Sequence, residues 1–334
     1  MGKSDMVMVI HPGALGDVLL ALPCFRMMRE RFPCHRVALL ASAGVGDLLK
    51  EAGEVAEAFS LERAFGCTLF SSEPTPTSQR CDWFGRCDRV IGFFSDPQGT
   101  LSATLGRFLS ADVILRSPFD RELRAIHQSA RFVEIVEGMA PRQVGLDPPL
   151  QISPGRRTRA RETLQRMGVN VSVEGLVAVH PGSGSLYKCA DPRLFAGVIN
   201  WAWDRGDQAV MIAGPADGAA VSAVTGLLAP DQVPILKACD LTTLASVLAQ
   251  TSLFVGNDSG VTHLAASVGA PTVTLFGPTD PARWGPIGPH VRVLQGDSCD
   301  CRSDWSRVRG CGMRPCLRID LPTLLSVCHR VAST

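Results

Sequence analysis

The sequence lacks a dominant charge, abundant aromatic residues and any long apolar run. Lys and Arg number 33 against 32 Asp and Glu, so the formal net charge of this 334-residue chain is only +1. This balance argues against a protein that a basic field draws to nucleic acid. Apolar runs such as GLVAVH end well short of the roughly 18 residues that a spanning helix needs, and MVMVI is too short for a secretory signal. We therefore expect a cytoplasmic protein with no nucleic-acid partner.

Hydrophobic residues, by contrast, make up 46% of the chain, which is enough to fill buried cores in two domains. Two segments about half a chain apart resemble each other, Met6–Asp17 and Gly175–Leu186. Each runs from apolar residues into His-Pro-Gly and a glycine-rich turn. A strand, a glycine turn and a helix in this order open a doubly wound parallel sheet.

The predicted fold class is α/β, with two Rossmann-like domains built on parallel sheets. We expect an N-terminal domain over residues 1–150, a C-terminal domain over 151–316, and a last helix over 317–334 that packs back across the hinge. The proline-rich segment 141–155 is the best linker candidate. Apolar runs predict strands at Arg36–Ala41, Asp88–Phe94, Leu176–Val179, Ala209–Ala213, Leu253–Val255 and Thr272–Leu275.

The most specific loop is the glycine-rich stretch after the predicted strand Leu253–Val255. It places Asp258, Ser259 and Gly260 at the start of a small-residue helix, whose free N–H groups and positive dipole end suit a diphosphate. His263, one turn into that helix, could face the same ligand. The alternative is an ordinary capped helix, with Asp258 or Ser259 as N-cap and His263 as a packing residue.

The loop after the second His-Pro-Gly carries Ser183, Gly184, Ser185 and Lys188. Its hydroxyl and backbone groups can donate to phosphate oxygens, and the lysine can supply a positive charge. The complete GxxxxGK[ST] pattern is absent, so Walker-type ATP hydrolysis is disfavoured. The alternative for Lys188 is a solvated surface lysine.

The loop after the first His-Pro-Gly carries Gly13, Gly16 and Asp17. It misses the G-x-G-x-x-G dinucleotide fingerprint, which disfavours a dehydrogenase. Asp17 begins the following helix, where the helix dipole favours the ionised carboxylate. Two interpretations of Asp17 stay open, an N-cap and a general base.

At these three loops the sequence resembles glycosyltransferase family nine, the ADP-heptose:lipopolysaccharide heptosyltransferases. The resemblance rests on GALGDVLLALP, on HPGSGSLYK and on DSGVTHLAASVGAPTVTLFGPTDPARWGP, in that order. It implies a GT-B architecture, in which two Rossmann-like domains face a cleft. It also implies that Asp17 is the catalytic base and that Lys188 lies near the donor phosphates. The donor-binding motif would comprise Asp258, Ser259, Gly260 and His263.

The resemblance further implies a nucleoside contact in the GPADG stretch, where Gly214 and Asp217 are candidates. The implied reaction is an inverting transfer of a heptose from an ADP-activated donor to a lipopolysaccharide-type acceptor. No metal or other cofactor is required, because Lys188 and the helix N-terminus would stabilise the departing ADP. Two alternatives are a family member that uses another nucleotide sugar for a different glycan or protein acceptor, and a non-catalytic nucleotide-sugar-binding protein.

Two further clusters stand outside these loops. Four cysteines with the spacing C-x-C-x9-C-x4-C, which differs from that of a usual zinc knuckle, are Cys299, Cys301, Cys311 and Cys316. Free thiols are favoured there over a disulfide or a structural metal.

A run of arginines follows the linker: Arg156, Arg157, Arg159, Arg161 and Arg166. Such a run usually forms a solvated helix face. The alternative is peripheral contact with the anionic inner membrane surface or with a phosphorylated glycolipid acceptor.

Overall fold

The structure, a computed structural model, describes residues 5–64, 86–108, 112–119, 126–138, 145–170, 175–230, 232–237, 239–301 and 304–333. The chain divides into two compact units, Met1–Val144 and Gly145–Thr334, each with its own parallel sheet. The division falls inside the proline-rich segment 141–155, whose residues 141–144 lie outside the described residues.

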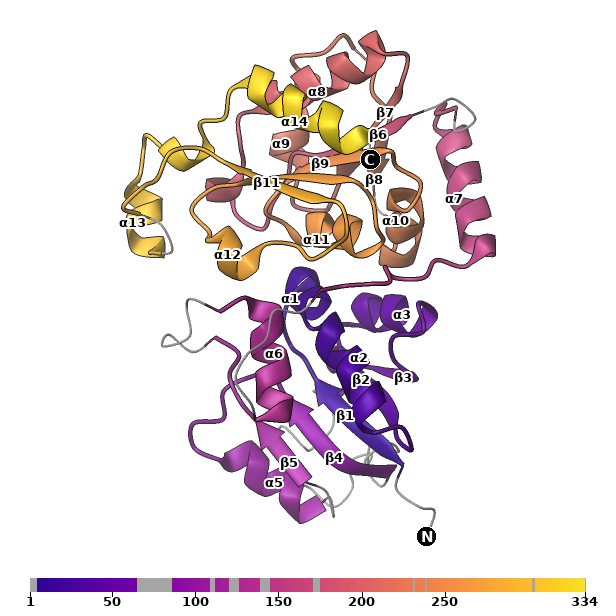
Figure 1. The fold of residues 1–334 in the computed structure, drawn as a ribbon, viewed down its shortest axis with the longest axis vertical. Coiled ribbons are helices and arrows are strands. Elements are labelled where there is room, and N and C mark those ends of the chain that lie inside the picture. Colours follow the sequence, from indigo (N-terminus) through magenta and orange to yellow (C-terminus); the bar gives the residue numbers. More distant parts are fainter. Residues whose placement is uncertain are drawn as a thin grey trace. The chain divides into compact units, whose positions relative to one another are not determined.

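The first unit holds a five-stranded sheet in the order β3-β2-β1-β4-β5 (Figure 1). The strands are β1 (Met6–Ile10), β2 (Arg36–Ala41), β3 (Glu57–Ser60), β4 (Cys87–Gly92) and β5 (Asp112–Leu115). The described helices are α1 (Leu15–Leu20), α2 (Leu22–Arg31), α3 (Ala43–Glu51), α4 (Leu61–Ala64), α5 (Thr100–Phe108) and α6 (Gln128–Glu137).

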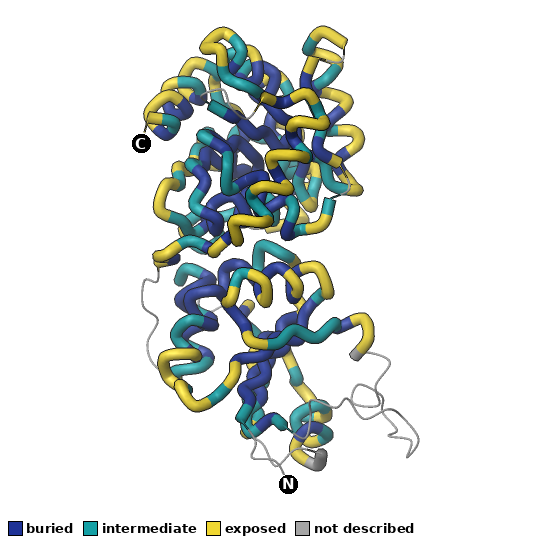
Figure 2. Tube along the Cα trace, turned by 90° about the vertical axis from the view of Figure 1, so that its right-hand side faces the viewer, coloured by how far each residue is buried: buried dark blue, intermediate teal, exposed yellow. Residues whose placement is uncertain are grey.

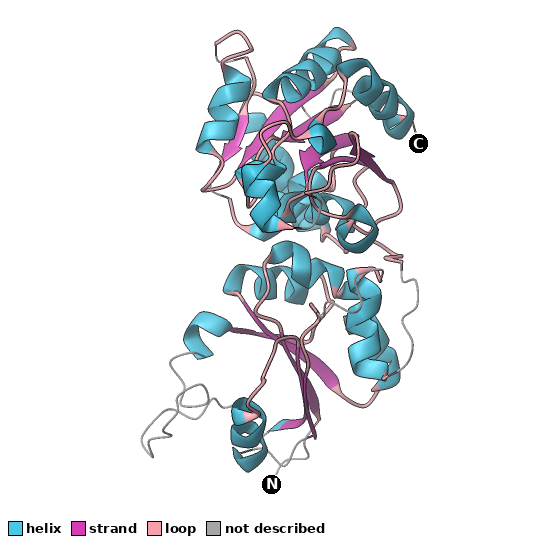
Figure 3. Cartoon of the chain, turned by 90° about the vertical axis from the view of Figure 1, so that its left-hand side faces the viewer, coloured by secondary structure: helices cyan, strands magenta, loops and turns pink. Residues whose placement is uncertain are grey.

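The central strand β1 shows why this sheet forms. All five residues of MVMVI are buried, as expected for a strand that helices cover on both faces. Met6, Met8 and Ile10 enter a core cluster that also contains Leu105 of α5. Figure 3 shows helices flanking the strands of this unit, and Figure 2 shows the strands as its most buried part.

The second unit holds a six-stranded sheet in the order β11-β10-β9-β6-β7-β8. The strands are β6 (Leu176–His180), β7 (Gln208–Ala213), β8 (Ile235–Lys237), β9 (Leu253–Asn257), β10 (Thr272–Phe276) and β11 (Val291–Gln295). The helices and 3-10 turns are α7 (Pro154–Arg166), η4 (Leu186–Lys188), α8 (Pro192–Asp204), α9 (Gly218–Thr225), α10 (Leu241–Leu248), α11 (Gly260–Ser267), α12 (Pro281–Trp284), α13 (Trp305–Gly310), η5 (Pro315–Leu317) and α14 (Leu321–Ala332).

One large core cluster joins alternate residues of this sheet to α8, α9 and α14. Helices α10 and α11 lie on the other side of the strands (Figure 1). Leu324, Val327, Cys328 and Val331 form the buried face of α14, which packs on α8 and on β9, β10 and β11. The apolar face of α14 is therefore used within the second unit, and its contact across the hinge stays a prediction.

The α/β fold with two parallel sheets is confirmed. The predicted strands all form, with bounds that differ by one or two residues at their ends. In the second unit the strand order reverses between β7 and β9, on either side of β6, as in dinucleotide-binding sheets. None of the described helices combines the length and the apolar character needed to span a membrane.

Candidate functional site

The carboxyl ends of β6 and β9 are neighbours at the point where the strand order of the second sheet reverses. Open parallel sheets bind ligands at this position, because the loops after the two central strands part there. Strand β6 ends at His180, and β9 ends at Asn257. The two glycine-rich loops of the second unit therefore start side by side, as the register of His180 against Gly256 also requires.

Asn257 ties the two loops together. Its amide nitrogen donates to the Pro181 carbonyl at 2.7 Å, and its side-chain oxygen accepts the Ala190 N–H at 3.0 Å. Ser183 Oγ adds a bond to the Asp258 carbonyl at 2.7 Å. Asn257 is fully buried, so these bonds replace its hydration. Sequence analysis missed Asn257; the available signal was a polar residue at the end of an apolar strand.

Lys188 and Asp258 form an ion pair between these loops. The Lys188 ammonium lies 2.7 Å from Asp258 Oδ2, with the lysine side chain 21% exposed and the aspartate 6% exposed. The ring of Trp305 lies on the same ammonium, with its centroid 5.8 Å from Nζ. The alternative of a freely solvated Lys188 is therefore wrong.

The rest of the second loop leads toward this pair. Ser185 Oγ accepts the Tyr187 N–H and begins the turn η4, which ends at Lys188. Gly184 is exposed, and a Cβ on it would meet open space. The loop thus presents backbone and hydroxyl groups beside one lysine at the edge of the sheet.

Ser259 is the N-cap of α11 and belongs to a buried hydrogen-bonded chain. Its Oγ accepts the Thr262 N–H at 3.3 Å and lies 3.1 Å from His180 Nδ1. His180 Nε2 in turn lies 2.9 Å from Asp217 Oδ2. A carboxylate only accepts hydrogen bonds, so Nε2 donates to Asp217, and Nδ1 faces the Ser259 hydroxyl. Ser259 therefore caps α11, as one of the two interpretations of the sequence predicted.

Asp217 and Gly214 are engaged inside the same network. The Gly214 N–H donates to Asp217 Oδ2 at 2.7 Å, and the hydrogen bond from His180 lowers the pKa of Asp217. Gly182 packs so closely that a Cβ on it would lie 1.9 Å from Asp217 Oδ1. The network thus fixes the backbone of both loops, and a nucleoside contact by Gly214 and Asp217 stays a prediction.

The first turn of α11 is buried apart from its start. Gly260 follows the N-cap at partial exposure, and the backbone N–H of His263 bonds to the Ser259 carbonyl at 3.2 Å. His263 is buried, with 6% of the residue exposed. A ligand role for His263 stays a prediction.

Asp17 lies in the first unit, in the first turn of α1, which follows β1 at the point where that sheet reverses between β2 and β4. Ala14 is the N-cap of α1, and Asp17 occupies the third helical position, so the N-cap interpretation of Asp17 is wrong. Its Oδ2 accepts the Ala14 N–H at 3.1 Å, and its location in the first turn favours the ionised carboxylate.

His11 contacts the loop between β1 and α1 through Gly13. It is fully buried against the rings of Phe93 and Phe132, which also contact each other, and burial lowers its pKa to about 3. The neutral imidazole accepts the Gly13 N–H at Nδ1, at 3.2 Å. Sequence analysis assigned no role to His11, although its recurrence as His180 was visible.

The clusters outside the loops are placed as follows. Cys299, Cys301 and Cys311 bring their sulfur atoms together, whereas Cys316 belongs to the core of the second unit. In α7, Arg157 donates to the backbone carbonyl of Ala249, which is the C-cap of α10, and Arg161 donates to the side-chain oxygen of Gln250. Arg159 and Arg166 are exposed, and membrane contact through this helix stays a prediction.

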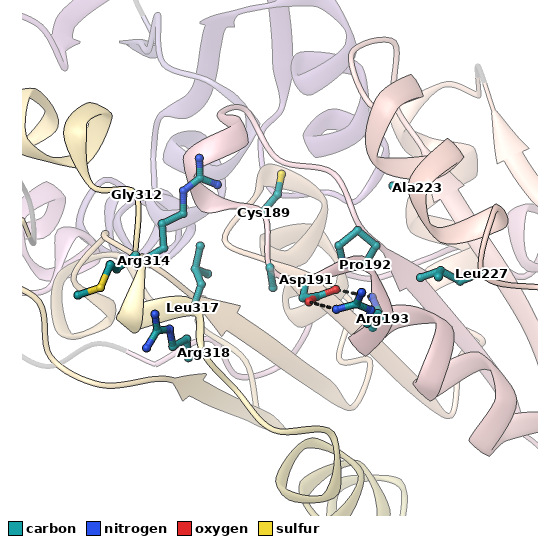
Figure 4. A pocket seen from close by; sticks show the side chains of 12 residues that line it. Cys189, Asp191, Pro192, Arg193, Ala223, Leu227, Gly312, Arg314, Leu317 and Arg318 are labelled. Atoms are coloured by element: carbon teal, nitrogen blue, oxygen red, sulfur yellow. Dashed lines mark hydrogen bonds and ion pairs between the residues drawn. The ribbon is translucent and has the colours of Figure 1, made fainter.

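A hollow of about 710 Å³ borders the Lys188 loop but is not lined by Ser183, Gly184, Ser185 or Lys188 (Figure 4). It lies between the segment Cys189–Arg193, helix α9 and the turn that contains Arg314. Asp191 and Arg193 pair with each other at its wall. The hollow is therefore a neighbour of the candidate site.

Comparison with known proteins identifies the family. The model of glycosyltransferase family 9 (heptosyltransferase) matches residues 129–310. Lipopolysaccharide heptosyltransferase 3 from Escherichia coli is 31% identical over 289 residues, covering 81% of this chain and 83% of the relative.

Two solved structures share the GT-B fold. The glycosyl transferase family 9 protein from Veillonella parvula has a TM-score of 0.79 at 18% identity, covering 100% of this chain and 98% of its own. The ADP-heptose lipopolysaccharide heptosyltransferase II of E. coli has a TM-score of 0.74 at 20% identity, covering 98% of both chains. With these motifs and this architecture, the chain belongs to glycosyltransferase family 9 and is a glycosyltransferase.

Proposed function

We propose that the protein transfers a heptose from an ADP-activated donor to a lipopolysaccharide-type acceptor, with inversion at the anomeric carbon. The observation that carries the proposal is the Lys188–Asp258 pair beside the N-terminus of α11, at the reversal point of the second sheet. Family membership supports it, as do the relatives named as lipopolysaccharide heptosyltransferase and ADP-heptose heptosyltransferase.

The donor diphosphate would bind Lys188, the backbone donors of Ser183 to Ser185 with the Ser185 hydroxyl, and the N–H groups at the start of α11. Asp258 cannot bind phosphate directly, because a carboxylate is an acceptor and repels the anion. Its part is to hold the Lys188 ammonium in place, at 2.7 Å. The positive groups would also stabilise the charge that develops on departing ADP, so no divalent metal is needed at the diphosphate.

Asp17 is the proposed general base. The ionised carboxylate accepts the proton of an acceptor hydroxyl while that oxygen forms a bond to the anomeric carbon. The bond from this carbon to the ADP phosphate oxygen breaks on the opposite face, and ADP leaves with the electron pair. An aspartate is ionised at neutral pH, and the location of Asp17 in the first turn of α1 suits its negative charge.

Calorimetric titration with ADP, UDP and GDP, first without metal and then with Mg²⁺, tests the donor class. We expect selective ADP binding that needs no Mg²⁺ and that weakens roughly ten- to a hundredfold in Lys188→Ala, the range for a hydrogen bond to a charged group. Lys237→Ala removes an exposed lysine of the same unit and is the matched control.

Three outcomes would contradict parts of the proposal. Preference for UDP or GDP would keep the fold and replace the donor by another nucleotide sugar. Equal binding by Lys188→Ala and Lys237→Ala would remove Lys188 from the site. An absence of nucleotide binding by the folded protein would favour a different ligand altogether.

A further inference from the structure

The buried hydrogen-bonded chain that begins at Asp217 continues past Ser259 to a backbone carbonyl. Ser259 Oγ lies 3.1 Å from His180 Nδ1 and 3.1 Å from Thr262 Oγ1. Thr262 Oγ1 in turn donates its hydrogen to the Asn257 carbonyl at 2.5 Å. A carboxylate at one end and a carbonyl at the other only accept hydrogen bonds, so the hydrogens between them can be counted.

This count leaves two arrangements of the chain. Thr262 has one hydroxyl hydrogen and gives it to Asn257, so the contact between the two hydroxyls is a hydrogen bond only when Ser259 donates. Ser259 then has no hydrogen left for His180, and Nδ1 must donate to Ser259. Because Nε2 already donates to Asp217, the ring in this arrangement carries both hydrogens and a positive charge.

In the other arrangement, Ser259 donates to Nδ1 and the His180 ring is neutral. The oxygens of Ser259 and Thr262 then face each other at 3.1 Å with no hydrogen between them. The two arrangements therefore differ by one proton on His180 and by the direction of one hydroxyl group. In both of them Ser259 Oγ accepts the Thr262 N–H, so the cap of α11 stays in place.

Burial makes these two arrangements distinct. His180 and Thr262 are buried, so water does not replace a hydrogen bond that either side chain lacks. Ser259, at 9% exposure, is the most exposed member of the chain and stands at the start of α11. The end of the chain nearest to solvent is thus the end at which the donor diphosphate would bind.

The groups around His180 act on its charge in opposite directions. Among the described residues, Asp217 forms its one ion-pair contact with His180, and the hydrogen bond from the ring lowers the pKa of this carboxyl. In the loop after β6, Lys188 is paired with Asp258, and burial raises the pKa of the Cys189 thiol, which stays uncharged at neutral pH. The Asp217 carboxylate thus favours a charged ring, whereas the loss of hydration on burial disfavours it.

Two further titratable side chains lie on the elements around this ring. They are His263, one turn into α11, and Arg314, whose guanidinium lies 5.2 Å from the centre of the Tyr187 ring. The described ion pairs of Asp217 include neither of them. With the two effects on His180 opposed, an additional charge nearby can decide between the two arrangements.

A diphosphate at the start of α11 supplies such a charge. The N–H groups of the first turn would hold its oxygens beside Ser259, which is in contact with the His180 ring. Negative charge close to a buried base favours the protonated form of that base, because little water lies between them to screen the attraction.

We propose that His180 is a positioning residue of the donor site, which takes up a proton when a nucleoside diphosphate binds. Uptake turns the Ser259 hydroxyl from His180 toward Thr262 and leaves a positive charge behind the first turn of α11. The proton comes from solvent and returns to it when the nucleotide leaves. The inference rests on the proposed function, because the diphosphate must bind at this turn.

Calorimetry of ADP binding in buffers of different ionisation enthalpy counts the protons taken up. Titrations at about pH 8 lie above the range near pH 6 in which phosphate monoesters titrate. We expect the wild-type protein to take up roughly 0.5–1 proton more per ADP than His180→Gln. The glutamine can donate to Asp217 and accept from Ser259, so it reproduces the neutral arrangement without titrating. His290→Gln, which changes an exposed histidine of the second unit, is the matched control and should behave as the wild type does.

The same linkage predicts a pH dependence of the affinity for ADP. A protein that binds a proton together with ADP binds ADP more weakly as pH rises. Between about pH 7.5 and pH 8.5, the wild-type affinity should fall about three- to tenfold more than that of His180→Gln, as expected for 0.5–1 proton.

Thr262→Val separates this role from a purely structural one. The valine keeps the branched shape and leaves His180 in place, but it removes the oxygen to which Ser259 donates in the charged arrangement. Proton uptake should therefore fall to the level of His180→Gln. Circular dichroism establishes that each variant is folded.

Equal proton uptake by the folded wild type and His180→Gln would overturn the coupling. So would wild-type uptake in Thr262→Val, because the Ser259 hydroxyl would then have no second acceptor to turn to. A folded wild-type protein that binds no ADP would instead contradict the proposed function and remove the coupling with it.

Discussion

The two units contain the same three residues, His-Pro-Gly, at the same place after their first strand, and use the histidine differently. His11 packs against two phenylalanine rings and remains neutral. His180 lies between the Asp217 carboxylate and the Ser259 hydroxyl. The local sequence thus determines the turn, and residues far along the chain determine the chemistry of the ring. An acidic residue, Asp17, follows the first motif, and a basic residue, Lys188, follows the second.

The largest expected effect follows from that difference in charge. Under the proposed function, Asp17→Asn should slow glycosyl transfer about 10²- to 10⁴-fold, the usual contribution of a general base, while ADP affinity stays unchanged. The amide oxygen still accepts the Ala14 N–H, so α1 should form. Single-turnover transfer rates and calorimetry measure the two quantities. Asp47→Asn, at an exposed acid of α3, is the control, and transfer by Asp17→Asn at the control's rate would exclude the base.

Acid should distinguish the two histidine environments. The folded pKa of His11 is about 3, below its ordinary 6.5, so the unfolded chain binds an extra proton between these values. The stability of the first unit should therefore fall as pH drops from 6.5 toward 3, by about 1.4 kcal/mol per pH unit. In the second unit, the lowered pKa of Asp217 contributes stability that is lost only as pH falls below 3.8.

Hydrogen exchange measured separately in each unit at pH 7 and pH 4.5 tests this contrast. We expect the first unit to lose more protection than the second. His11→Phe fills the same space without titrating and should abolish the excess loss. If the pH dependence of the first unit survives in His11→Phe, another group is responsible.

The smallest of these effects concerns the glycine of each motif. A Cβ at Gly182 would lie 1.9 Å from Asp217, and one at Gly13 would lie 2.7 Å from the His11 ring. Gly182→Ala and Gly13→Ala should each lower the free energy of unfolding by roughly 1–3 kcal/mol through overpacking. Gly184→Ala, whose Cβ meets open space, is the control in denaturant unfolding. Equal stability of Gly182→Ala and Gly184→Ala would show that the His180 network yields easily.

Sequence patterns predicted the central strands better than the edge strands. Continuous apolar runs such as MVMVI are typical of strands that are buried on both faces, and β1, β6, β9 and β10 are such strands. At the edges, β8 has three residues and β11 is partly exposed along its length. Part of each of these strands faces solvent, so their sequences mix polar and apolar residues, and such a mixture predicts a strand only weakly.

Spacing identified the loops of the candidate site and left their contacts undetermined. The ion pair between Lys188 and Asp258 joins residues far apart in sequence, and only the adjacency of β6 and β9 brings them together. The cysteines show the same limit. The backbone turn that brings Cys311 to Cys299 and Cys301 has no recognised sequence pattern, and the state of these thiols stays a prediction.

The strand order of each sheet has a consequence for synthesis on the ribosome. In both units the first strand to be made, β1 or β6, is the one that ends between two neighbours. MVMVI obtains β2 as a partner soon after it emerges, but its other edge waits for β4, which begins at Cys87. Until then one edge of this wholly apolar strand has no hydrogen-bonded neighbour. Such an edge favours aggregation of the growing chain. Strand β6 waits in the same way for β9, which begins at Leu253, so both halves of this enzyme pass through this exposed stage while they are being translated.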